Sequence, residues 1–258
     1  MKNNELKILC IGNSFSEDTT AHLAEIALLL GISKIKVANL YVGGCSINKH
    51  CFHAEQDMPA YRYDLNMGNG WQKTPNYRIS DAIKSDDWDW ISIQHGTGDG
   101  SRYTEIKSYE KLSWLIAYIK GLAHRKTKIA FNMTWVGEPD FHHEEIRHYG
   151  GDQLLIYNKI AELTKEHILT IQGIDVVSPT GTAIQNARTG GIGLLTRDGY
   201  HLSLDTGRYI AGMTFLKALT DTDVSDATFI DDTRVRMIAV EAVNNAIADP
   251  FRISSSKL

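Results

Sequence analysis

The chain has 258 residues, of which 43% are hydrophobic and 22% are charged, so it can bury a large core and is not expected to be disordered. Its formal net charge is −4 and it contains no basic block, which removes the electrostatic basis for binding nucleic acid. No apolar run approaches the roughly 20 residues of a membrane-spanning helix, and no leader pattern opens the chain, so we expect no membrane partner and a cytoplasmic location, unless a longer precursor is exported.

Short apolar runs alternate with longer amphipathic ones, which is typical of a parallel sheet covered by helices. The apolar runs predict strands over Leu6–Ile11, Lys34–Val42, Trp90–Gln94, Lys128–Thr134 and Ile174–Ser178. The amphipathic runs predict helices over Thr20–Leu30, Glu105–His124, Gln153–His167, Asp205–Leu219 and Thr233–Ile247. Prolines and glycines in Ser46–Asn76 predict a long loop there, with room for short helices. No linker or repeat divides the sequence, which favours one domain over residues 1–258.

A serine follows the first predicted strand, in Gly12-Asn13-Ser14. Ligands of open α/β sheets bind beyond the carboxyl ends of the strands, so residues in this position are candidates for chemistry. Gly12 permits a tight turn, and Ser14 would begin a helix whose backbone N–H groups stabilise negative charge. This placement suits a nucleophile that attacks an ester and generates an oxyanion. A plain helix N-cap is the structural alternative for Ser14.

The second candidate motif is Asp198-Gly199-Tyr200-His201, late in the chain. An aspartate three residues before a histidine can accept the Nδ1 proton while Nε2 faces a serine. Alone, this spacing more often reflects surface turns or helix capping. In combination with Ser14 it predicts a Ser-His-Asp triad.

These motifs together resemble those of the SGNH (GDSL-type) hydrolases. Gly12-Asn13-Ser14 resembles the first block of that family, Gly43-Gly44-Cys45-Ser46 the second and Asp198-Gly199-Tyr200-His201 the last. The resemblance implies a flavodoxin-like three-layer α/β/α sandwich with a central parallel sheet. It also implies that Ser14 is the nucleophile, His201 its base and Asp198 the residue that orients His201. The N–H of Gly44 and that of Ser14 would bind the oxyanion, and no metal or organic cofactor would be needed.

The third block departs from the family pattern, Gly-x-Asn-Asp, whose asparagine completes the oxyanion hole. Gly96-Thr97-Gly98-Asp99 has a glycine at that position. We predict that Gln94 supplies the amide instead, as the resemblance to carbohydrate acetylesterases with a glutamine at the end of this strand implies. The alternative is that Gln94 ties two loops together.

Several other side chains are candidates for substrate contact. His95 follows the third strand, with a structural hydrogen bond as its alternative role. Trp135 follows the fourth strand and is predicted to stack on a sugar ring, with core packing as its alternative. We also expect aromatic residues in or near the long loop to wall the pocket: Phe52, Tyr61, Tyr63 and Trp71.

Metal and disulfide sites receive little support. His143 and His148 are five residues apart, whereas a helical zinc motif needs a spacing of four, so a solvated segment is favoured. Cys10, Cys45 and Cys51 are not the framework of a disulfide-rich protein, although a Cys45–Cys51 pair stays open.

The sequence therefore predicts a serine esterase that hydrolyses a short acyl ester, with an acetylated carbohydrate as the expected substrate. Two alternatives stay open. One is a non-catalytic carbohydrate- or acyl-binding module on the same fold. The other is an acyltransferase that uses the same triad.

Overall fold

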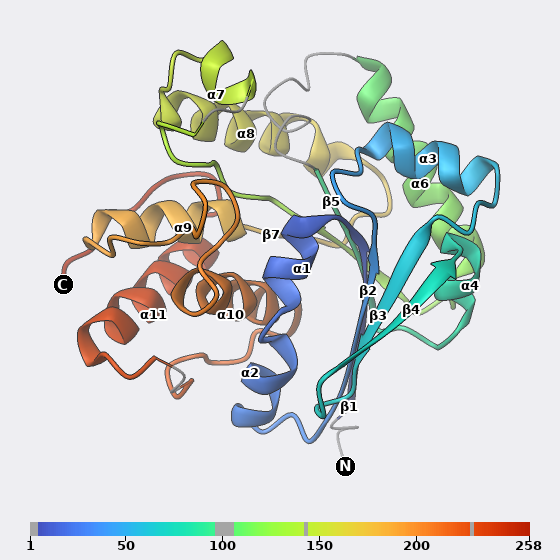
Figure 1. The fold of residues 1–258 in the computed structure, drawn as a ribbon, viewed down its shortest axis with the longest axis horizontal. Helices are drawn as coiled ribbons and strands as arrows, with labels where there is room; N and C mark the ends of the chain where they lie inside the picture. The colour runs from blue at the N-terminus through green and yellow to red at the C-terminus, as the bar shows by residue number, and fades with distance from the viewer. Residues whose placement is uncertain (1–4, 96–105, 142–143, 228–229) are drawn as a thin grey trace.

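The computed structural model of the chain describes residues 5–95, 106–141, 144–227 and 230–258. Its centre is a seven-stranded sheet with the strand order β4-β3-β2-β1-β5-β6-β7 (Figure 1). Five strands are parallel: β1 (Glu5–Gly12), β2 (Lys34–Tyr41), β5 (Trp90–Gln94), β6 (Lys128–Asn132) and β7 (Val176–Ser178). These are the five strands that the apolar runs predicted.

Two strands at the edge of the sheet correct the prediction of a loop over Ser46–Asn76. This segment contains α3 (Ile47–Glu55) and an antiparallel hairpin of β3 (Tyr61–Asn66) and β4 (Trp71–Tyr77). The hairpin was missed because β4 carries a proline and is largely exposed. The alternation of apolar and polar residue types in β3 is the signal that was available. The sheet is consequently mixed rather than wholly parallel.

Helices cover both faces of the sheet, so the predicted three-layer α/β/α architecture is confirmed (Figure 1). One face packs against α1 (Ser14–Thr20), α2 (Leu23–Leu29), α9 (Thr180–Thr189), α10 (Thr206–Thr220) and α11 (Thr233–Ala248). The opposite face packs against α3, α4 (Ile79–Lys84), α6 (Ile106–Leu122) and part of α8 (Gln153–Glu166). Among the described residues, the other helical segments are α7 (Glu144–His148) and a 3-10 turn over Ile168–Thr170.

The strands separate two apolar layers because alternate side chains point to opposite faces. In β1, Ile8 and Cys10 join one layer, whereas Leu9 and Ile11 join the other. Helix α1 begins directly after β1, six residues earlier than the predicted helix over Thr20–Leu30, which the structure divides between α1 and α2. In the described part of the chain, no helix is both long and apolar enough to cross a membrane.

Candidate active site

Ser14 is the first residue of α1, and Asn13 caps the helix by accepting a hydrogen bond from the Phe15 N–H at 3.0 Å. The chain can turn here because residue 12 is glycine. A Cβ at Gly12 would lie 2.6 Å from the Oγ of Ser16 and 3.3 Å from the Cδ of Gln94, which is too close for any other side chain. Since Asn13 provides the cap, the alternative role of Ser14 as an N-cap is removed.

The structure brings together the three residues of the predicted triad. The Nε2 of His201 lies 3.0 Å from the Oγ of Ser14, and its Nδ1 lies 2.7 Å from the Oδ2 of Asp198. The other carboxylate oxygen of Asp198 accepts from the backbone N–H groups of Tyr200 and His201, at 3.0 and 2.7 Å. Gly199, with φ of +82°, supplies the left-handed residue that this tight turn requires.

Two opposing effects act on the pKa of Asp198. Partial burial raises the pKa, but hydrogen bonds from the His201 side chain and from the N–H groups of His201 and Tyr200 outweigh burial and hold the pKa below its usual value. Asp198 is therefore a carboxylate at neutral pH. A carboxylate in this position can accept a hydrogen bond from the Nδ1–H of His201, and in that tautomer Nε2 can accept a hydrogen bond from the Ser14 hydroxyl.

A buried carboxylate that the sequence analysis missed holds the histidine loop against α1. Asp18 is fully buried, one turn after Ser14, and accepts from Arg197 at 3.0 Å and from the Nε of Arg208 at 2.8 Å. It also accepts from the backbone N–H of Leu202, the residue after His201, at 2.8 Å. A charged residue on the buried side of a short helix, four positions after the candidate nucleophile, is the sequence signal that could have found it.

Gln94 ends β5, as predicted, and its amide is directed to Asn13, the residue before Ser14. The Nε2 of Gln94 donates to the Oδ1 of Asn13 at 3.0 Å, which corresponds to the alternative role of tying two segments together. The Nδ2 of Asn13 in turn donates to the carbonyl of Cys45 at 3.1 Å. Asn13 thus connects β1, β5 and the loop that carries Gly44. This residue, too, was missed as a connecting group.

Gly44 lies in the exposed turn after β2, with φ of +59°. A Cβ there would meet nothing within 4 Å, so the requirement for glycine is conformational rather than steric. The third block, Gly96-Thr97-Gly98-Asp99, lies outside the described residues, as do His142 and His143.

Trp135 is fully buried, so the prediction that it stacks on a sugar ring is wrong. Its ring packs 4.4 Å from that of Phe15, and its indole N–H donates to the carbonyl of Tyr200 at 2.9 Å. Trp135 therefore contacts, from within the core, the sequence neighbours of Ser14 and His201. His95 is also buried and packs edge-on against Phe131, which leaves it without the exposed ring that a substrate contact needs. Burial lowers the pKa of His95 to about 3, so it is neutral.

The predicted aromatic wall is only partly present. Tyr61 and Tyr63 are buried in the apolar layer on the α3 side, so the prediction for these two rings is wrong. Phe52 is exposed, and Trp71 lines a pocket beside α1. The three cysteines are free thiols, which answers the open question of a Cys45–Cys51 pair.

The sequence and the structure of this chain are similar to those of known proteins. Residues 7–249 match a family model described as "Domain of unknown function (DUF4886)". The crystal structure of a DUF4886 family protein from Bacteroides uniformis is similar, with 32% sequence identity and a TM-score of 0.90 over 97% of this chain and 98% of that one. No curated protein matches the sequence.

More distant structures share the fold. Axe2, an acetylxylan esterase from Geobacillus stearothermophilus, has 15% identity and a TM-score of 0.53, over 85% of this chain and 97% of that one. A putative platelet activating factor from Streptococcus pneumonia has 17% identity and a TM-score of 0.54, over 83% and 84% of the two chains. At these identities the similarity concerns the fold alone.

Proposed function

We propose that this chain, which belongs to the DUF4886 family, is a single-domain serine esterase that hydrolyses a short acyl ester through Ser14, His201 and Asp198. The observation that carries the proposal is the continuous hydrogen-bonded chain from the carboxylate of Asp198 through His201 to the Ser14 hydroxyl. An exposed carboxylate, an imidazole and a hydroxyl in this order form the arrangement that activates a serine.

In the proposed reaction, the Oγ of Ser14 attacks the ester carbonyl and its proton passes to the Nε2 of His201. The C–O bond of the ester then breaks, and the alcohol leaves with the proton from His201. Water attacks the acyl enzyme in the same way, with His201 again as the base, and releases the acid and Ser14.

The negative charge of the tetrahedral intermediate needs donors that are already in place. The proposed donors are the N–H of Ser14 at the start of α1, the N–H of Gly44 and the second hydrogen of the Gln94 amide. One hydrogen of that amide is bonded to Asn13, and a primary amide has two. Asn13, which holds both Gln94 and the Gly44 loop, is the proposed positioning residue for this set.

The proposed substrate is an acetyl ester on a carbohydrate. The acetylxylan esterase that shares the fold acts on such a substrate by its name, and it is this likeness that motivates the choice. No metal or organic cofactor enters the proposed reaction.

The test is hydrolysis of 4-nitrophenyl acetate by the purified chain, with Ser14→Ala and Ser80→Ala as a matched pair. Ser80 lies on α4 and its hydroxyl bonds to Asp57, so its loss controls for the removal of a serine hydroxyl as such. We expect Ser14→Ala to lower kcat by about 10⁴-fold or more and Ser80→Ala to leave it unchanged. A fluorophosphonate probe is expected to label wild type on Ser14. Equal activity of Ser14→Ala and wild type contradicts the proposal.

A further inference from the structure

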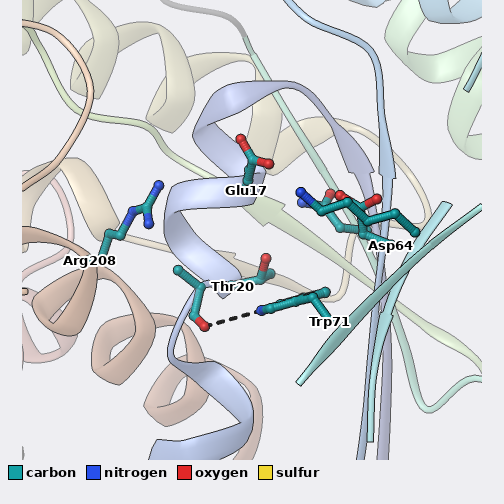
Figure 2. A pocket seen from close by; sticks show the side chains of 8 residues that line it. Glu17, Thr20, Asp64, Trp71 and Arg208 are labelled. Carbon is teal, nitrogen blue, oxygen red and sulfur yellow. Dashed lines mark hydrogen bonds between the residues drawn. The ribbon is translucent and has the colours of Figure 1, made fainter. Parts of the chain in front are cut away.

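A pocket of about 230 Å³ lies beside α1, at the edge hairpin of the sheet (Figure 2). Figure 2 shows Arg208 of α10 and Asp64 of β3 on opposite sides of α1, with Glu17 and Trp71 between them. Thr20 of α1, Asn39 of β2 and Lys73 of β4 also contribute to the polar lining. The triad residues do not line this pocket.

The pocket nevertheless shares a face of α1 with Ser14. Along α1 and the residue after it, only Ser14, Glu17 and Ala21 are partly exposed, and every residue between them is buried. Positions three and seven residues after a given residue lie on the same side of a helix. Glu17 therefore follows Ser14 along one accessible stripe, about 4.5 Å further along the helix axis. A ligand bound at Ser14 can extend along this stripe into the pocket.

The floor of the pocket is polar although it belongs to the sheet. Asn39 and Asp64 are register partners on β2 and β3, and both are buried. Arg62 binds Asp64 through two nitrogens, at 2.7 and 2.6 Å, and reaches Glu17 at 2.8 Å. Placing an acyl chain against these groups would remove them from water without offering them further hydrogen bonds, which is unfavourable. The pocket is therefore suited to the alcohol part of an ester rather than to a long acyl part.

The charges of the lining balance. Arg62 binds both Glu17 and Asp64, and Arg208 binds the buried Asp18, so these charges are compensated by ion pairs and no strong net charge selects an ion. Carboxylate acceptors and cationic donors that alternate around a small space match hydroxyl groups, which both donate and accept. Asn39, whose Oδ1 accepts a hydrogen bond from the Ser16 hydroxyl at 2.8 Å, adds a primary amide to this lining.

Trp71 adds an apolar wall. Its ring is half-buried, and its indole N–H donates to the carbonyl of Ala21 at 3.4 Å, which connects the hairpin to α1. A ring of this kind, next to hydroxyl-binding groups, covers the C–H face of a sugar while its polar edge is hydrogen-bonded.

We propose that this pocket is a subsite for a neutral sugar ring of the substrate, adjacent to the sugar whose ester lies at Ser14. The proposal rests on the proposed function for the direction in which the substrate extends. Binding of a sugar in the pocket does not itself require hydrolysis, so the two proposals can fail separately.

The test is isothermal titration calorimetry of the full chain with xylotetraose and with cellotetraose. We expect at least one of them to bind, and Trp71→Ala to weaken that binding by about tenfold or more, equivalent to about 1.4 kcal/mol. Trp114→Ala is the matched control, because Trp114 is a surface tryptophan on α6, across the sheet. Lys73→Ala removes an exposed donor of the lining and is expected to weaken binding without a folding defect, as checked by circular dichroism.

The outcomes are distinct. Absence of binding by both neutral tetrasaccharides overturns the subsite, as does equal weakening by Trp71→Ala and Trp114→Ala. If tetragalacturonic acid binds more tightly than either neutral sugar, the proposal that the subsite prefers an uncharged sugar is overturned. If a tetrasaccharide binds through Trp71 but 4-nitrophenyl acetate is not hydrolysed, the subsite stands and the proposed esterase activity fails.

Discussion

The two flanks of α1 each carry a carboxylate, but one carboxylate is buried and the other is partly exposed. On one flank, Asp18 is fully buried and enclosed by Arg197, the Leu202 N–H and Arg208, whose side chain also reaches the pocket lining. On the other, Glu17 is partly exposed and borders the open pocket. One residue apart in sequence, these carboxylates differ in what surrounds them. The closed flank is suited to holding the triad in register, and the open flank to contacting a ligand.

The largest expected effect comes from the triad carboxylate on the closed flank. Asp198→Asn is expected to lower kcat by about 10⁴-fold, because the amide no longer favours the imidazole tautomer that accepts from Ser14. Since Asp198 is 46% exposed, we expect little change in the free energy of unfolding. Steady-state kinetics and urea unfolding measure the two quantities, and activity within tenfold of wild type would remove Asp198 from the triad.

The pH dependence sharpens this expectation. Because the pKa of Asp198 is held below its usual value, its contribution to stability is present above about pH 4 and is lost as pH falls through the lower native pKa. Urea unfolding of wild type and Asp198→Asn between pH 7 and pH 3 measures this contribution, and wild type is expected to lose more stability than the variant as the pH falls. An equal loss of stability in the two proteins would contradict a lowered pKa of Asp198.

Asp18 is expected to have the largest effect on stability. Asp18→Ala leaves two arginines around a site without its carboxylate, and we expect the free energy of unfolding to fall by about 3 kcal/mol or more. Activity should fall as well, because the loop that carries His201 loses its anchor to α1. Asp18→Asn retains one oxygen acceptor and serves as the milder control. If Asp18→Ala lowers the free energy of unfolding by less than Glu17→Ala does, the contrast between the two flanks is contradicted.

Substitutions of Gln94 test its proposed role as a donor in the oxyanion hole. If its amide donates to the intermediate, Gln94→Ala should lower kcat by about 100-fold or more. Gln94→Glu keeps the shape but removes the donor, so a similar loss is expected. Unchanged kcat in both variants would leave the bond to Asn13 as the role of Gln94 and remove it from the reaction.

The smallest expected effect is that of Glu17→Ala on stability. Its pair with Arg62 is about one-third exposed on both sides, and pairs of this kind contribute less than about 1 kcal/mol. Urea unfolding of Glu17→Ala and Asp18→Ala, measured together, compares the two losses in the free energy of unfolding. A loss as large as that of Asp18→Ala would mean that the open flank is structural as well.

Some of this arrangement follows from the sequence alone. The five parallel strands were predicted because each is a compact apolar run between turn residues. Asp198 and His201 were paired in advance because three residues of separation let one turn hold both side chains. Ser14 was identified because a glycine after a strand and a polar residue at a helix start are local features.

The tertiary structure alone decided the rest. Asp18 meets Arg197 across 179 positions and Arg208 across 190, and Gln94 meets Asn13 across 81, so no local pattern predicts these contacts. Trp135 was placed wrongly because a tryptophan after a strand has the same local pattern whether its ring faces a ligand or the core. The edge hairpin forms the polar pocket only when β3 pairs with β2, which brings Asp64 beside Asn39. Side-chain type and short-range spacing determine the chemistry that is available, whereas long-range packing determines which groups meet and how exposed they are.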